Sequence, residues 1–140
     1  MHALTDKLVS ELDLLYGLYH LAVDLTRRIQ PDDEATTVRF IEARQKILER
    51  TAVTSKEAAA LLKSFREERM IPANEKALIE EKRNLILDVS AKMQQADSQV
   101  MRAMQQKLAS IRRELAGQTE KKNAARAYIT APQSIALASL

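Results

Sequence analysis

The sequence predicts an all-α protein: an elongated antiparallel helical bundle, or coiled-coil-like hairpin, with a long C-terminal helix. Three observations support this fold class. Ala, Leu, Glu, Lys and Arg make up about half of the chain, a composition typical of long helices and coiled coils. Only two glycines and three prolines occur among the 140 residues, too few for the turns of a β-rich fold. Apolar residues recur at steps of three and four over most of the chain, which is the period of a helix with one buried face.

The first helix should span about residues 5–30, where Pro31 ends it because proline cannot donate a backbone hydrogen bond. Gly17 lies in the middle of this helix, where it weakens the helix and indicates a close approach of another helix. The expected apolar seam consists of Leu8, Leu12, Leu15, Tyr19, Ala22 and Ile29, with Thr26 as its polar member.

A second helix should cover about residues 33–51. Its inner face is predicted to carry Val38, Ile41, Gln45 and Leu48. The segment Thr54-Ser55-Lys56-Glu57 has the pattern of a capping box, which predicts the start of a third helix there. The residues that this helix should bury are Ala58, Leu61, Leu62 and Phe65. The alternative is one bent helix through both segments, because nothing between Arg50 and Thr54 forces a break.

The last helix should follow the turn at Met70-Ile71-Pro72-Ala73-Asn74, with Asn74 as its N-cap, and extend to about Ala127. Its seam should contain Ile79, Lys82, Ile86, Val89, Met93, Ala96, Val100 and Ala103. At about 1.5 Å per residue such a helix would be roughly 80 Å long, about twice the length that the first helix can cover. Either the long helix extends past the others, or it breaks near Gly117 to give a short final helix.

The second half of this long helix carries the candidate partner-binding residues. They are Val100, Met104, Leu108, Ile111 and Leu115. Where the long helix outruns the first one, these side chains could form an apolar groove for a helix of a partner. The alternative is that they complete the core of the bundle.

The helical pattern gives one bundle domain at residues 1–128 and an apolar C-terminal tail at residues 129–140. The tail contains no charged side chain, whereas a solvated tail usually has several. We therefore expect it to dock on the exposed part of the long helix and to shield it. The candidate tail residues are Tyr128, Ile129, Ile135, Leu137 and Leu140.

Residues that could support catalysis are scarce. The chain has no cysteine, and its two histidines, His2 and His20, have no acidic residue at the spacing of a zinc site. Two glycines cannot build a phosphate-binding loop or a nucleophile elbow. We therefore expect no enzyme activity, no cofactor and no metal, and a function exerted by binding.

The sequence also predicts where the protein acts. No stretch approaches 18 uncharged apolar residues, so we expect no membrane insertion, and the first residues lack the pattern of a signal peptide. The default expectation is a cytoplasmic protein. The C-terminal third is basic, with Arg102, Lys107, Arg112, Arg113, Lys121, Lys122 and Arg126. Such a face could attract nucleic acid, but only Tyr128 could stack on bases there, so we expect no nucleic-acid partner.

Two segments of the chain have similar sequences, Glu42-Ala43-Arg44-Gln45-Lys46-Ile47-Leu48 and Glu81-Lys82-Arg83-Asn84-Leu85-Ile86-Leu87. Asp97 follows on the long helix, and the basic stretch from Lys121 to Tyr128 follows near its end. This arrangement resembles the bacterial flagellar type III export chaperones of the FlgN and FliT kind. Those proteins open with a Leu-rich helix, place an acid-x-Arg-x-x-Leu-Leu-like segment on the next helix, and end in a long helix with a short basic, Tyr-containing stretch.

The resemblance covers roughly residues 5–128 and implies a specific role. Such chaperones are cytoplasmic and bind the amphipathic terminal segment of a filament-type subunit, such as a hook-associated or cap protein. They deliver this client to the type III export apparatus, with export ATPase components as further partners. Two other classes of function stay open: a coiled-coil scaffold that self-associates, for example as a homodimer, and a basic bundle associated with nucleic acid.

Overall fold

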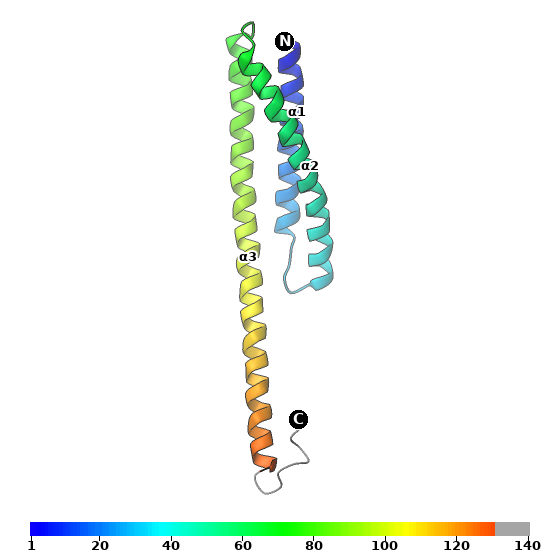
Figure 1. The fold of residues 1–140 in the computed structure, drawn as a ribbon, viewed down its shortest axis with the longest axis vertical. Coiled ribbons are helices and arrows are strands. Elements are labelled where there is room, and N and C mark those ends of the chain that lie inside the picture. The colour runs from blue at the N-terminus through cyan, green and yellow to red at the C-terminus, as the bar shows by residue number, and fades with distance from the viewer. Residues whose placement is uncertain (131–140) are drawn as a thin grey trace. The chain divides into compact units, whose positions relative to one another are not determined.

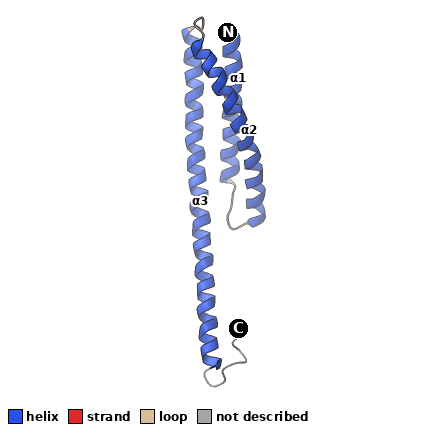
Figure 2. Cartoon of the chain, viewed as in Figure 1, coloured by secondary structure: helices blue, strands red, loops and turns tan. Residues whose placement is uncertain are grey.

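The computed structural model describes the backbone of residues 1–130 and the side chains of residues 1–127. This part of the chain forms three helices, α1 (Ala3–Arg27), α2 (Glu34–Glu67) and α3 (Ala73–Thr130). No strand occurs among the described residues, and Figure 2 shows helices joined by short connections. The all-α fold class is therefore confirmed.

The chain divides into two units, Met1–Met101 and Arg102–Leu140. The first unit contains α1, α2 and the beginning of α3. Within this unit α2 runs antiparallel to both α1 and the first part of α3 (Figure 1). Of the second unit, the structure describes the remaining part of α3. Each unit is described below by itself.

The buried face of α1 follows the predicted seam closely. His2 caps the helix, because its Nδ1 accepts a hydrogen bond from the backbone N–H of Leu4 at 3.0 Å. The buried residues of α1 are Thr5, Leu8, Leu12, Leu15, Leu18, Ala22, Val23 and Thr26. Gly17 is exposed, and a Cβ built on it would meet nothing within 4 Å. The predicted close approach at Gly17 is therefore wrong.

The segment predicted to contain two helices is the single helix α2. Thr54 is buried in its middle, so the predicted capping box is wrong and the one-helix alternative is confirmed. The N-cap is Asp33, whose carboxylate accepts hydrogen bonds from the Thr36 hydroxyl at 2.6 Å and from the Thr36 N–H at 3.1 Å. Both hydrogen bonds lower the pKa of Asp33 below its ordinary value, and the bond from the Thr36 hydroxyl has the larger effect.

The buried face of α2 agrees with the prediction at Ala58 and Phe65 and differs from it in the first half of the helix. Val38 and Ile41 are 48% and 41% exposed, whereas the buried positions are Thr51, Thr54, Ala58 and Phe65. A threonine can occupy a buried position of a helix when its hydroxyl is bonded to its own backbone. The Thr51 hydroxyl donates to the carbonyl of Ile47 at 2.8 Å. The predicted inner face is therefore wrong at Val38, Ile41 and Gln45, whereas Leu48 is half-buried against the second apolar cluster of the core.

The first turn of α3 is capped by a backbone carbonyl and not by a side chain. The carbonyl of Pro72 accepts hydrogen bonds from the N–H groups of Glu75 and Lys76, each at 3.1 Å, so Asn74 lies within the first turn and is not the N-cap. The buried carboxylate of Glu75 accepts a hydrogen bond from the N–H of His2 at 2.7 Å, which joins the beginnings of α3 and α1. The helix continues through Gly117, so the alternative with a break there is wrong and the continuous long helix is confirmed.

The core of the first unit contains two apolar clusters that span its helices. The first consists of Leu8, Leu12, Ala58, Phe65, Ile71 and Ile79. The second consists of Ala22, Val23, Val89 and Met93. The seam predicted for α3 supplies buried residues to both, and its charged member Lys82 forms an ion pair with Asp13 of α1 at 2.7 Å.

Candidate functional site

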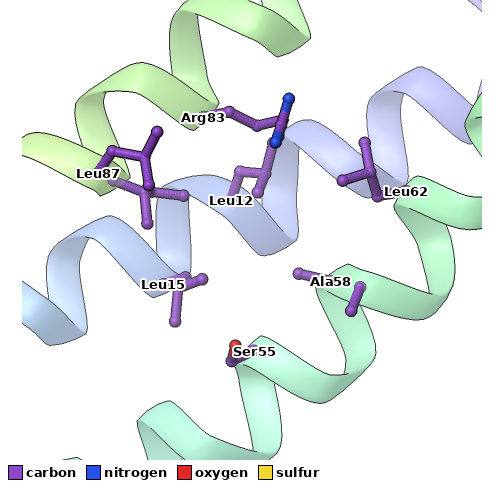
Figure 3. Close-up of a pocket in the computed structure, with 9 residues that line it drawn as sticks. Leu12, Leu15, Ser55, Ala58, Leu62, Arg83 and Leu87 are labelled. Atoms are coloured by element: carbon purple, nitrogen blue, oxygen red, sulfur yellow. The ribbon is translucent and has the colours of Figure 1, made fainter. Parts of the chain in front are cut away.

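An open cavity of about 160 Å³ lies between α2 and α3, with α1 beneath it (Figure 3). Leu12 and Leu15 of α1 form its floor. Ser55, Ala58, Ala59 and Leu62 line it from α2, and Arg83, Ile86 and Leu87 line it from α3. Apart from Ser55 and Arg83, every lining side chain is apolar.

A second cavity of about 240 Å³ adjoins the first, because Leu62 and Arg83 line both. Its other lining residues are Phe65, Arg66, Lys76, Ile79 and Glu80. We call the two cavities together the α2–α3 furrow. On α3 the furrow extends over residues 76–87, which at 1.5 Å per residue is about 17 Å, or three helical turns.

The furrow combines an apolar interior with a charged rim. Leu87 lies at its edge and is 63% exposed. Arg83 pairs with Glu80 at 2.9 Å on the rim, and Arg66 and Lys76 add two further positive charges. The arrangement therefore suits the apolar face of an amphipathic segment that carries acidic side chains beside that face.

The furrow offers apolar contacts and charged side chains to a ligand, and the described residues contain no candidate metal site. Among residues 1–130 no group of three or more His, Asp or Glu side chains could hold a metal ion. Within the same residues no helix has the length and apolar character needed to cross a membrane.

Sequence reasoning missed the furrow because it assigned Leu12, Leu15, Ala58 and Leu62 to the core. One signal was available. Leu85-Ile86-Leu87 places three large apolar residues in succession, so at least one must point away from the buried face of α3. Leu87 is 63% exposed and Leu85 is 39% exposed, so both point away from that face.

The predicted partner-binding residues of α3 divide between the two units. Val100 belongs to the first unit and is half-buried. In the second unit Met104 is half-buried, whereas Leu108, Ile111 and Leu115 are 47%, 41% and 57% exposed. We call Met104, Leu108, Ile111 and Leu115 the α3 stripe. The four residues of the stripe lie on one face of a single helix, so by themselves they form a flat strip and not a groove with two sides.

The side chains of the predicted tail residues lie outside the described part of the chain. Ile135, Leu137 and Leu140 lie outside the described residues. Tyr128 and Ile129 fall within the backbone of α3, but their side chains also lie outside the described part. The docking of the tail therefore stays a prediction.

Arg44, the third residue of the segment from Glu42 to Leu48 that carries the family resemblance, connects three helices. Its Nε donates to the Thr26 hydroxyl of α1 at 2.7 Å, and its Nη2 donates to the carboxylate of Asp97 on α3 at 2.5 Å. The Thr26 hydroxyl in turn donates to the carbonyl of Ala22 at 2.7 Å. We call Arg44, Thr26 and Asp97 the Arg44 junction. Two residues quoted for the resemblance, Arg44 and Asp97, thus form an ion pair within the bundle.

Comparisons with models of known protein families, with curated proteins and with solved structures gave no match to this chain. The fold class therefore follows from the structure itself, and a function has to be argued from the surfaces described above.

Proposed function

We propose that this protein is a cytoplasmic flagellar export chaperone. It binds the amphipathic terminal segment of a filament-type subunit, a hook-associated or cap protein, and delivers this client to the type III export apparatus. The observation that carries the proposal is the α2–α3 furrow, an exposed apolar channel with two helical walls and a floor.

The furrow has the geometry that helix-in-groove recognition requires. An amphipathic helix places its apolar anchors at spacings of three, four and seven residues, so three turns of client match the three turns of α3 along the furrow. The client's apolar side chains would cover Leu12, Leu15 and Leu87.

The resemblance supports the same proposal from a second direction. The acid-x-Arg segment includes Arg44, and the spaced acid of the long helix is Asp97. Their ion pair gives both residues a structural role, since it ties α2 to α3. A chaperone that holds and releases a client needs no catalytic group, and the proposal includes no cofactor, no metal and no nucleic acid.

The test is a calorimetric titration of the protein with synthetic terminal segments of hook-associated and cap subunits. We expect at least one terminal segment to bind, and an internal segment of the same subunit not to bind. Replacing Leu87 at the furrow edge by Glu should weaken binding. Burying a leucine side chain gives about 1.5–3 kcal/mol, so the loss should be about tenfold to a hundredfold in affinity.

The matched control is Leu21→Glu. Leu21 lies on α1, is 50% exposed and does not line the furrow. Because both leucines are at least half exposed, neither substitution should disturb the core, and circular dichroism should show the same helical content. The proposal fails if no terminal segment binds, or if both variants bind as tightly as the unmodified protein.

A further inference from the structure

The α3 stripe has the spacing of a coiled-coil seam. Met104, Leu108, Ile111 and Leu115 follow one another at steps of four, three and four residues. These steps place Met104 and Ile111 at position d of the heptad, and Leu108 and Leu115 at position a. Three of the four side chains are between 41% and 57% exposed. A seam of this kind buries its residues only when a second helix packs along it.

The charges beside the stripe determine which second helix fits. Lys107 and Glu114 occupy position g, and Gln105 and Arg112 occupy position e. In a parallel pair of identical helices, Lys107 would face Arg112 of the other copy, and this like-charge contact would occur twice. In an antiparallel pair, g faces g and e faces e. Lys107 then faces Glu114 of the other copy, also twice, and Gln105 faces Arg112.

We infer that the α3 stripe docks against the α3 stripe of a second copy of this chain, with the two helices antiparallel. In this register Leu108 of one copy packs against Ile111 of the other, and Met104 packs against Leu115. All four apolar residues of each copy are then paired with apolar residues, and both Lys107–Glu114 contacts form across the interface.

The register shifted by one heptad toward the C-terminus is less favourable. This shift places Leu108 opposite Gln118 and Met104 opposite Lys122. The ammonium group of Lys122 would then face the apolar seam, where burial of an unpaired charge is costly. Because only two a and two d residues from each copy form the seam, the dimer should be in equilibrium with the monomer and should depend on protein concentration.

The absence of cysteine from the natural chain permits a direct test with single-cysteine variants. Met104→Cys and Leu115→Cys proteins are prepared separately, mixed and treated with a short bis-maleimide, and the products are identified by mass spectrometry. The expected product is the mixed dimer. Two Met104→Cys chains should not link to each other, because positions 104 and 115 are eleven residues apart, or about 17 Å along the helix.

A parallel dimer would give the opposite pattern, since each variant would then link to itself and the mixed product would be disfavoured. That pattern would overturn the inference. Absence of any cross-link, together with a monomer in sedimentation measurements of the unmodified protein up to about 100 times the concentration of the cross-linking assay, would overturn it as well.

A charge exchange tests the pairing without altering the apolar seam. Glu114→Lys replaces two attractive contacts by two Lys–Lys contacts, so the dissociation constant of the dimer should rise several-fold. The double variant Lys107→Glu/Glu114→Lys should restore it. The matched control is Glu120→Lys, at position f, which points away from the seam and should leave the dimer unchanged. Equal effects of Glu114→Lys and Glu120→Lys, or no restoration by the double variant, would contradict the inference.

This inference does not depend on the proposed function. Leu87→Glu alters the furrow and should not change the dissociation constant of the dimer, and Glu114→Lys should not change client affinity. Failure of one proposal is therefore measured separately from failure of the other.

Discussion

Gly17 has open surroundings that leave room for a side chain. It lies inside α1, is exposed, and a Cβ at this position meets no atom within 4 Å. Glycine in a helix interior costs about 1 kcal/mol relative to alanine, because it loses more backbone freedom on folding. Gly17→Ala should therefore stabilise the protein by about that amount.

The measurement for Gly17→Ala is the free energy of unfolding from a urea titration followed by circular dichroism. An increase with an unchanged denaturant slope is the expected result. A decrease would mean that Gly17 is contacted closely in solution, and would contradict the open surroundings of this residue in the structure.

Buried threonines mark where sequence reasoning succeeds and where it fails at the level of single residues. Thr26 was placed correctly in the α1 seam because apolar residues stand on both sides of it. Thr51 and Thr54 occupy two successive seam positions of α2, so the apolar pattern is interrupted there. The bond from the Thr51 hydroxyl to Ile47 explains why such a position can be buried, but the pattern of apolar residues does not reveal it.

At the scale of elements, the Arg44 junction fixes how α2 packs against its neighbours. Arg44 contacts Thr26 and Asp97 at once, and its side chain is only 21% exposed. Removing the guanidinium by Arg44→Met should cost about 1–3 kcal/mol, because the buried Thr26 hydroxyl loses a charged donor. Asp97 is 45% exposed, so Asp97→Asn should cost less, on the order of 1 kcal/mol or below.

A double-mutant cycle between Arg44→Met and Asp97→Asn measures the pair directly. The two effects should be less than additive, because the second substitution has no ion pair left to remove. Strict additivity in urea unfolding would show that Arg44 and Asp97 do not interact in solution. In that case the resemblance segment would need a role other than helix packing.

The elements themselves were largely predictable, whereas the surface between them was not. The seven-residue repeat of α3 identified Ile79, Val89, Met93 and Ala96 as buried, since a heptad pattern depends only on local spacing. The furrow depends on how far apart α2 and α3 lie at Leu62 and Leu87. That separation results from packing of residues distant in sequence, which no local pattern specifies. The residues of the α3 stripe were identified from the sequence as part of a groove. In the structure they all lie on α3, so the stripe alone does not form a groove.

At the scale of the whole molecule, the two units carry different kinds of surface. The first unit contains the α2–α3 furrow, which has apolar walls and a basic rim. The second unit contains the α3 stripe, which has opposite charges beside one apolar face. We propose that the furrow binds a client segment and that the stripe binds a second copy of the chain. The two proposed binding surfaces therefore lie on separate parts of the sequence.

The most direct test of the central claim is to locate a bound client on the chain. A photoactivatable benzophenone can be attached to Ser55→Cys in the furrow, to Leu108→Cys in the α3 stripe, or to Val38→Cys on an exposed face of α2. With the terminal segment of a hook-associated or cap subunit as probe, the account predicts a cross-link from position 55 and none from positions 38 and 108. A cross-link from position 108 without one from position 55, or equal cross-linking from all three, would contradict it.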